Sequence, residues 1–306
     1  MPKRARTRRA ADRRRLALAF AFHGLRLPGF PGFPGLPETP NAPSLAQLSW
    51  SCEEGPFPVD ADGSFREIPH GLAIEWGGYA RYEVTRDHAG AQVRVMRDGI
   101  DEAEAARGFL FSVFPAALPL FGMEPLHGSA VEVDGGALLM LGATGSGKSS
   151  IAAAFGSLGY AILSDDACAL DADADLWPGP PLVNPRWRGS ELAVVSAYNG
   201  KVVQAGATGS RVPHELTGIV LVKPQDGADF GVRELTSAEA FPEILANARL
   251  PGVLADLRRS TQLLIASAVA RRPCVEVRFD PIRHEPDVIA TSLMTRMGEM
   301  HARSRD

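Results

Sequence analysis

The chain has 306 residues, 45% hydrophobic and 22% charged, which is typical of a soluble globular protein with one or two domains. Its three cysteines, Cys52, Cys168 and Cys274, have no C-x-x-C spacing, which argues against a disulfide framework or a zinc site. This cysteine content suits a reducing cytoplasm, where we expect the protein to reside.

The net charge of −4 is unevenly distributed, because residues 1–15 contain eight Lys or Arg and a single acid. A basic tail can contact nucleic acid or an acidic surface. We expect instead a solvated, disordered N-terminus and no nucleic-acid partner. The apolar stretch 16–22 is too short for a secretory signal, and no apolar run approaches the length of a membrane span. Neither export nor a membrane partner is therefore expected.

The first third of the chain is predicted to be a small β-rich module over residues 16–110. Residues 16–27 alternate loosely and are predicted as a first strand, and the Pro/Gly-rich segment 28–43 as an irregular connector. Short apolar segments separated by turn sequences then continue from 48 to 98. Residues 103–115 are predicted to form a helix that leads into a second domain over 111–306.

A phosphate loop is predicted near the middle of the chain. Residues 128–133 and 137–141 are predicted as paired strands, and residues 148–157 as a helix. Between them, eight residues fit the pattern G-x-x-x-x-G-K-[ST], namely Gly142, Ala143, Thr144, Gly145, Ser146, Gly147, Lys148 and Ser149. A strand before this pattern and a helix after it make a chance match an unlikely alternative.

The residue types of this loop are those that phosphate binding requires. Glycines let backbone N–H groups point at phosphate oxygens, and the helix N-terminus adds partial positive charge. Lys148 is placed to reach the β- and γ-phosphates and the Ser149 hydroxyl to ligate Mg²⁺, with Ser150 beside it in the first helical turn. The sequence therefore predicts that ATP and Mg²⁺ bind here.

The remainder of the chain predicts an α/β domain. Strands are expected over 160–163, 218–222 and 274–279, and helices over 237–250, 251–270 and 286–297. Residues 171–217 contain many Pro, Gly and Asn and are left unassigned.

Two adjacent carboxylates, Asp165 and Asp166, follow the strand after the loop's helix. At the carboxyl edge of an α/β sheet they are well placed to serve a ligand. Phosphoryl transfer to a hydroxyl needs one group near Mg²⁺ and one to accept the hydroxyl proton, and the pair could divide these roles. The alternative is that they only cap a turn. Since the chain has neither an L-S-G-G-Q nor an [NT]-K-x-D sequence, transporter ATPases and GTPases are less favoured than kinases.

His127-Gly-Ser-Ala-Val, the phosphate loop and Leu163-Ser-Asp165-Asp166 together resemble the catalytic domain of the HPr kinase/phosphorylase family. The resemblance implies a fold related to phosphoenolpyruvate carboxykinase, preceded here by the β-rich module. It also implies an active-site role for His127, phosphate binding by Lys148 and metal binding by Ser149. Asp166 would accept the proton of a substrate serine and Asp165 would lie beside the metal. Alone, His127 would be interpreted as a turn or core histidine.

This chain also departs from the family pattern. The E-I-R-G-L-G motif of the bifunctional enzymes is absent, and Arg188-Gly-Ser-Glu191 is a poor substitute, which puts phosphorolysis and HPr as substrate in doubt. The N-terminal module is more similar to a divergent branch that includes lasso-peptide kinases, which implies a precursor peptide with an acceptor serine. The relatives also suggest a homo-oligomer. Four basic residues could neutralise phosphate or a peptide carboxylate, or be surface charges: Arg186, Arg188, Lys201 and Arg211.

Three functions remain open from the sequence. The first is an ATP- and Mg²⁺-dependent serine kinase that acts on a protein or peptide. The second is a catalytically inactive, nucleotide-sensing regulator or scaffold, which the absent second motif favours. The third is a kinase of a small hydroxyl compound such as free serine.

Overall fold

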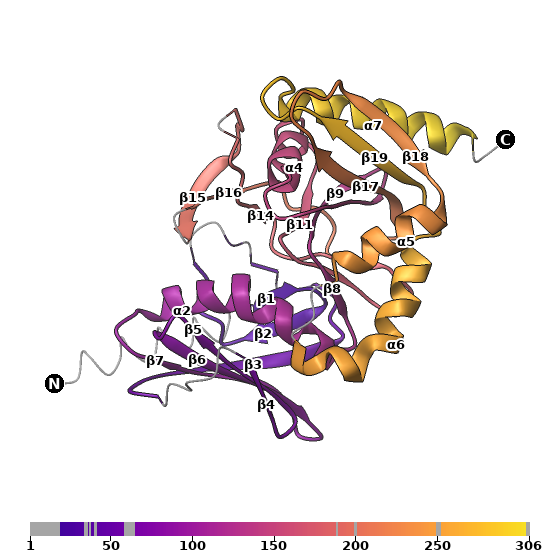
Figure 1. Cartoon of the computed structure of the whole chain (residues 1–306). Coiled ribbons are helices and arrows are strands. Elements are labelled where there is room, and N and C mark those ends of the chain that lie inside the picture. Colours follow the sequence, from indigo (N-terminus) through magenta and orange to yellow (C-terminus); the bar gives the residue numbers. More distant parts are fainter. Residues whose placement is uncertain are drawn as a thin grey trace.

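The structure is a computed structural model that describes residues 19–303, apart from 34–35, 37, 40–41, 58–64, 188, 199–200 and 249–251. The basic tail 1–15 and Arg188 lie outside the described residues. The described elements make a mixed α/β protein with sheets of seven, six, three and three strands (Figure 1).

The N-terminal part is a seven-stranded sheet that begins with a hairpin. The sequence predicted one strand over 16–27, and this was wrong, because His23 and Gly24 have φ of +51° and +71° and reverse the chain between two short strands. In spatial order the strands are β1 (Ala19–Phe22), β2 (Leu25–Pro28), β3 (Ala46–Glu54), β7 (Gly90–Arg97), β6 (Ala80–Asp87), β5 (Gly71–Trp76) and β4 (Phe65–Ile68).

A continuous helical run covers one face of this sheet (Figure 1). It starts at the Asp101 cap, whose carboxylate accepts from the Glu104 N–H at 2.7 Å, and it ends at Gly122, with φ of +83°. The expected domain boundary at 110–111 lies inside this run. Its segments are α2 (Glu102–Gly108), the π-helical η1 (Phe109–Val113), α3 (Phe114–Ala117) and the 3₁₀ turn η2 (Leu118–Phe121).

The same run corrects an expectation about membranes. Glu102–Phe121 is long and apolar enough, by length and composition, to cross a membrane, whereas the sequence analysis expected no such stretch. However, 72% of its most apolar window is buried inside the protein, against the seven-stranded sheet. Its apolar character is therefore that of a core helix.

The second part is built on a six-stranded sheet with helices on both faces. Its central strand β10 alternates between the two cores, because Leu139 and Leu141 pack on one side and Leu138 and Met140 on the other. The antiparallel edge strand β18 was not predicted. In spatial order the strands are β11 (Ile162–Asp165), β9 (Gly128–Val133), β10 (Gly136–Leu141), β17 (Leu216–Pro224), β19 (Cys274–Phe279) and β18 (Gly231–Leu235).

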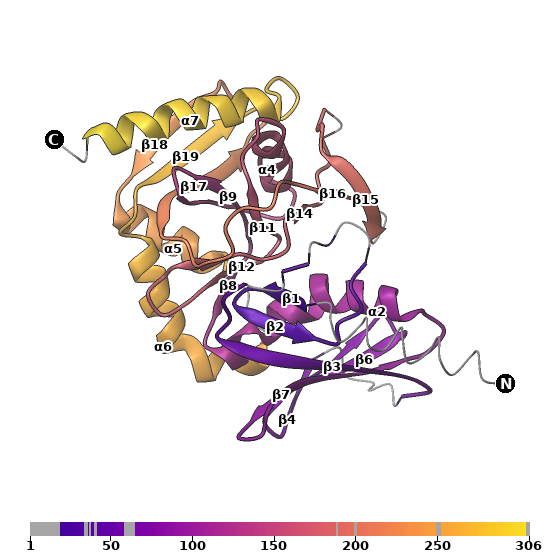
Figure 2. The same cartoon turned by 180° about the vertical axis from the view of Figure 1, so that it is seen from behind.

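Four helices complete these two cores, as Figures 1 and 2 show from opposite sides. Side chains of α4 (Lys148–Ser157) and α7 (Pro286–Arg303) bury one face of the sheet. Side chains of α5 (Ser237–Ala246) and α6 (Gly252–Val269) bury the other. The result is a three-layer α/β/α arrangement.

The segment 171–217, left unassigned from sequence, contributes to two small sheets. One has the order β13 (Leu176–Trp177), β12 (Cys168–Leu170) and β8 (Glu124–Leu126). The other has the order β14 (Leu182–Val183), β16 (Lys201–Ala205) and β15 (Ala193–Tyr198). These short strands link the two larger sheets, since Trp177 and Leu182 belong to the core of the N-terminal part.

Strand direction sets the position of the site. β10 and β11 both pair antiparallel with β9, while β17 pairs parallel with β10 and with β19. Strands β10, β11, β17 and β19 therefore run in one direction and end at one edge. Ligands of α/β sheets bind outside such an edge.

A pH dependence of stability follows from the buried hairpin histidine. His23 is 2% exposed, and burial lowers its pKa from 6.5 to about 4, helped by the nearby positive Arg211 and opposed by a bond to the Trp177 carbonyl. The folded state therefore favours the neutral ring. The stability that depends on a neutral His23 is fully present above pH 6.5 and is lost as the pH falls towards 4. We expect the free energy of unfolding to fall by about 2 kcal/mol more between pH 7 and pH 5 in the wild type than in His23→Asn, measured by urea unfolding. Equal losses in the two proteins would contradict this expectation.

Candidate phosphate-loop site

The loop between β10 and α4 is shaped by glycines. Gly142, Gly145 and Gly147 have φ of +149°, +84° and +101°, and a Cβ on Gly142 would lie 2.6 Å from the Val222 carbonyl oxygen. Helix α4 starts from Gly147 with no side-chain cap and no acidic residue in its first turn. Its first N–H groups are therefore available to an anion.

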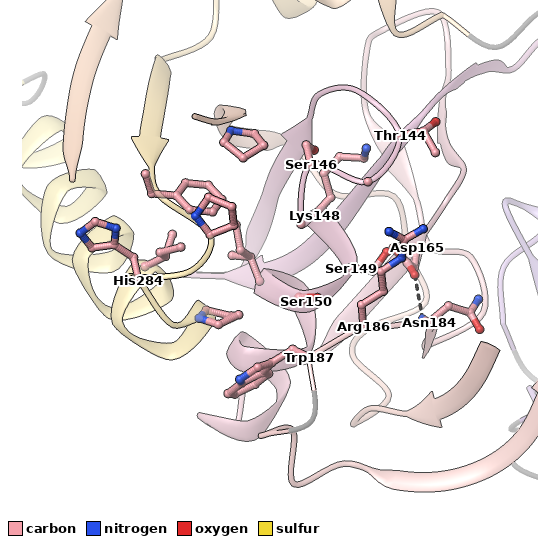
Figure 3. A pocket seen from close by; sticks show the side chains of 18 of the residues that line it. Thr144, Ser146, Lys148, Ser149, Ser150, Asp165, Asn184, Arg186, Trp187 and His284 are labelled. Carbon is pink, nitrogen blue, oxygen red and sulfur yellow. Dashed lines mark hydrogen bonds between the residues drawn. The ribbon is translucent and has the colours of Figure 1, made fainter. Parts of the chain in front are cut away.

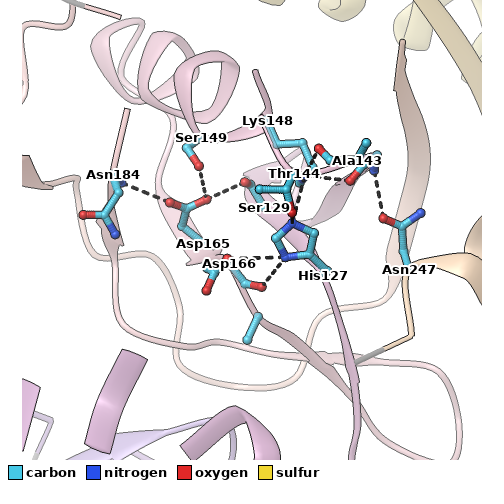
Figure 4. Close-up of polar contacts among 12 residues, drawn as sticks. His127, Ser129, Ala143, Thr144, Lys148, Ser149, Asp165, Asp166, Asn184 and Asn247 are labelled. Carbon is cyan, nitrogen blue, oxygen red and sulfur yellow. Dashed lines mark hydrogen bonds and ion pairs between the residues drawn. The ribbon is translucent and has the colours of Figure 1, made fainter. Parts of the chain in front are cut away.

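The Lys148 side chain lies back over its own loop. Its Nζ donates to the carbonyl oxygens of Gly142 at 2.7 Å and Ala143 at 2.9 Å, and it lies 3.2 Å from His127 Nε2 (Figure 4). An ammonium group can only donate, so His127 Nε2 accepts in this contact and the ring proton is on Nδ1. Lys148 is only 5% exposed. Its ammonium group is therefore buried at the base of the loop, where the two carbonyls fix its position.

Asp165, at the end of β11, is held by several donors. Its Oδ1 accepts from the Ser129 hydroxyl at 2.5 Å and the Ser149 hydroxyl at 2.9 Å, and its Oδ2 accepts from the Asn184 N–H at 3.0 Å (Figure 4). Burial raises the pKa of Asp165, as does the charge of Asp166, while the hydrogen bonds act in the opposite direction. This carboxylate therefore gains from a cation placed beside it.

Asp166 and His127 form the other half of the site. Asp166 has φ of +69°, a conformation that aspartate tolerates. Its carboxylate lies against His127, whereas that of Asp165 lies against Ser129 and Ser149. His127 Nδ1 lies 3.3 Å from the Asp166 carboxylate and 3.2 Å from its backbone oxygen. The carboxylate remains 39% exposed, so a hydroxyl from solvent can reach it.

One pocket of about 530 Å³ is lined by the loop residues from Thr144 to Ser149 together with His127, Asp165, Asp166 and Asn184. Gly142 and Ala143, whose carbonyls hold Lys148, and Ser129, which holds Asp165, lie behind this lining. Figure 3 shows Lys148 and Thr144 at one end of the pocket and His284 and Trp187 at the other. The Trp187 indole N–H donates to Glu285 at 3.0 Å. This second end is more apolar, and its lining includes Ile151, Trp187, Pro224, Phe279, Pro281 and Ile289.

Two polar atoms in the pocket wall are buried without a hydrogen-bond partner among the described residues. They are Ser146 Oγ, in the loop, and Asn184 Oδ1, opposite it. Buried polar atoms are costly unless paired, so both favour a polar ligand in the pocket.

The four basic residues singled out in the sequence have different positions. Arg186 lines the pocket, with a guanidinium nitrogen 3.9 Å from the place that a Cβ on Gly145 would occupy. Arg211 is half-buried, donates to the carbonyls of Gly179 and Ala21 at 2.8 and 2.7 Å and does not line the pocket, so it matches neither alternative left open from the sequence, a phosphate or carboxylate contact or a solvated surface charge. Arg188 and the side chain of Lys201 lie outside the described part of the chain.

The sequence did not point to two residues that support the site, Asn247 at the loop and Asn184 at Asp165. Asn247, at the end of α5, accepts from the Gly142 N–H through Oδ1 at 3.1 Å and from the His127 N–H through its backbone oxygen at 2.7 Å. Asn184 holds Asp165 through its backbone N–H. No motif marks them, because Asn247 lies 105 residues from Gly142 and Asn184 acts on Asp165 through its main chain.

No protein-family model matches the chain, and no curated protein matches it. Among solved structures, the HPr(Ser) kinase/phosphatase from Coxiella burnetii is similar at 15% identity and a TM-score of 0.32, over 59% of this chain and 94% of that one. A TM-score this low carries no argument about function, which must come from the site itself.

Proposed function

We propose that this protein is an ATP- and Mg²⁺-dependent kinase that phosphorylates a serine hydroxyl of a protein or peptide. One observation carries the proposal. A single pocket of about 530 Å³ is lined by an uncapped, glycine-shaped helix N-terminus with its lysine, a serine–carboxylate pair, and a second, exposed carboxylate beside a histidine. These are the parts that phosphoryl transfer to a hydroxyl requires.

The triphosphate is assigned to the loop end of the pocket. The N–H groups at the start of α4, which no side chain caps, and the Ser146 hydroxyl donate to phosphate oxygens, and Lys148 supplies the positive charge. The nucleoside then extends towards the more apolar end near Trp187 and Phe279. A pocket with one anion-binding end and one more apolar end suits a nucleotide better than a free phosphate.

The donor set fits Mg²⁺. Ser149 Oγ and Asp165 Oδ1 lie 2.9 Å apart, and both are hard oxygen ligands. The described residues contain no cluster of three or more His, Cys, Asp or Glu that could enclose a metal, which suits an ion that keeps waters and phosphate oxygens as its other ligands. When bound, Mg²⁺ would neutralise charge on the transferred phosphoryl group.

Asp166 is assigned as the proton acceptor. As the serine oxygen bonds to the γ-phosphorus and the bond from that phosphorus to the bridging oxygen of ADP breaks, the hydroxyl proton passes to the Asp166 carboxylate. His127, with its proton on Nδ1, orients this carboxylate by donating to it. ADP and a phosphoserine leave as products.

Arg186 is expected to stabilise charge that develops during transfer. Its exposed guanidinium lines the pocket beside Gly145 of the loop. Arg186→Ala should lower kcat about 10- to 100-fold, and Arg186→Lys, which keeps the charge but not the planar donor group, should recover part of this loss. Steady-state kinetics of both variants provide the measurement, and an unchanged kcat in Arg186→Ala would remove Arg186 from the mechanism.

The deciding experiment is transfer of γ-labelled phosphate from ATP, with Mg²⁺, to serine-ended peptides, HPr and free serine. Label on a peptide or protein supports the proposal, and label on free serine alone would reassign the enzyme to a small hydroxyl substrate. If ATP binds and no acceptor is labelled, the chain is a nucleotide-sensing regulator instead. Asp166→Asn and Lys148→Ala are the variants to run in parallel.

A further inference from the structure

The tip of the first hairpin lies directly behind the Asp165–Asp166 turn. A cavity of only about 10 Å³, the size of one water molecule, separates the two parts. It is lined from the N-terminal part by His23, Leu110, Phe111 and Pro115, and from the other part by Asp165, Asp166, Ala167, Pro180 and Leu182. The N-terminal module therefore reaches the turn that carries both candidate catalytic carboxylates.

His23 is fixed firmly at this tip. Its N–H donates to the Pro178 carbonyl at 2.8 Å, its Nδ1 lies 3.3 Å from the Trp177 carbonyl, and its ring is 5.6 Å from that of Phe114. On the preceding strand β1, the Ala21 carbonyl accepts from Arg211, which also donates to the Gly179 carbonyl. The hairpin and the segment 177–179 are thus held together as one unit.

The contact reaches the turn through Gly179. A Cβ on Gly179 would lie 2.5 Å from His23 Cε1 and 2.4 Å from Ser164 Oγ, so only a glycine fits between these two groups. The Ser164 hydroxyl donates to the Ala167 carbonyl at 2.5 Å, which closes the turn around Asp165 and Asp166. A chain of contacts therefore runs from His23 through Gly179 and Ser164 to Ala167.

We propose that His23 is a positioning residue, which supports the Asp165–Asp166 turn by packing through Gly179 onto Ser164. The proposal rests on the proposed function for its kinetic consequence. Asp166 has φ of +69° in this turn, and the hairpin tip supplies one wall of the cavity behind it. Loss of that wall lets the Asp166 carboxylate move relative to His127 and the acceptor hydroxyl.

Two substitutions separate this role from simple core packing. Glycine and asparagine both tolerate the positive φ of His23, so His23→Gly removes the ring without new backbone strain, and His23→Asn retains a short donor for the Trp177 carbonyl. His70 provides a matched control, because it has φ of +63° in the exposed turn between β4 and β5. His70→Gly should leave every readout unchanged.

The first readout is kinetic. Positioning predicts that His23→Gly lowers kcat about 10- to 100-fold while the affinity for ATP stays within about threefold, and that His23→Asn loses less. Both variants are compared as folded protein, verified by thermal unfolding. An unchanged kcat in folded His23→Gly would overturn the proposal.

The second readout does not need an acceptor. In protein with ¹⁵N-labelled histidine, the ring signals of His127 report its bond to Asp166. They should shift in His23→Gly and stay in place in His70→Gly, and unmoved signals in His23→Gly would overturn the positioning role. If the wild type phosphorylates no acceptor, the proposed function fails, and this measurement still decides whether His23 supports the turn.

Discussion

Asp166→Asn should lower kcat for phosphoryl transfer on the order of 10³-fold while leaving the affinity for ATP within about threefold. The carboxamide has the size of the carboxylate and tolerates the φ of +69° at this position, so the turn is retained. It cannot take up the acceptor's proton, and it presents a neutral group to His127 Nδ1 at 3.3 Å. Only the chemical step should therefore suffer.

The measurement combines single-turnover transfer with calorimetric titration of ATP. A matched control is Asp134→Asn, since Asp134 also has positive φ, at +52°, in the exposed turn between β9 and β10. This control should retain wild-type transfer. Turnover by Asp166→Asn close to that of the wild type would show that another group accepts the proton, and the assignment would then be lost.

The elements around the loop could be predicted because their signals are local. β10 has apolar residues on both faces, as a central strand needs, and α4 begins at the lysine of a pattern whose glycines permit the turn. The aspartate pair was placed correctly at the end of β11, although the strand begins at Ile162 rather than at 160. These features depend on residues that are close together in the sequence, so they can be predicted from one sequence alone.

The features that sequence analysis missed depend on distant contacts or on backbone conformation. The first hairpin was taken for one strand, because a His-Gly pair reverses the chain only when the histidine adopts positive φ, and that cost is met by its burial against Trp177 and Pro178. Asn247 supports the loop from another helix. Arg211 resembles a surface charge in the sequence, yet its partners are carbonyls at positions 21 and 179.

Lys148→Ala should lower kcat/KM for ATP on the order of 10³-fold, with most of the loss in nucleotide affinity. The ammonium group has three N–H donors. Two are used by the carbonyls of Gly142 and Ala143, which fix the charge at the base of the loop, and the third faces His127 Nε2 at 3.2 Å. The third is the donor that a phosphate oxygen would take, because His127 Nε2 keeps an alternative partner in the Thr144 hydroxyl at 3.5 Å.

This exchange of partners gives the prediction a second observable. ATP should change the environment of the His127 ring in the wild type and leave it unchanged in Lys148→Ala, as seen in the ring signals of ¹⁵N-labelled histidine. Lys223→Ala serves as the control, since Lys223 pairs with Glu243 at 2.7 Å and does not line the pocket. If Lys148→Ala bound ATP as tightly as the wild type, the loop amides would suffice for the phosphates, and the role of Lys148 would be to hold the loop and His127 in place.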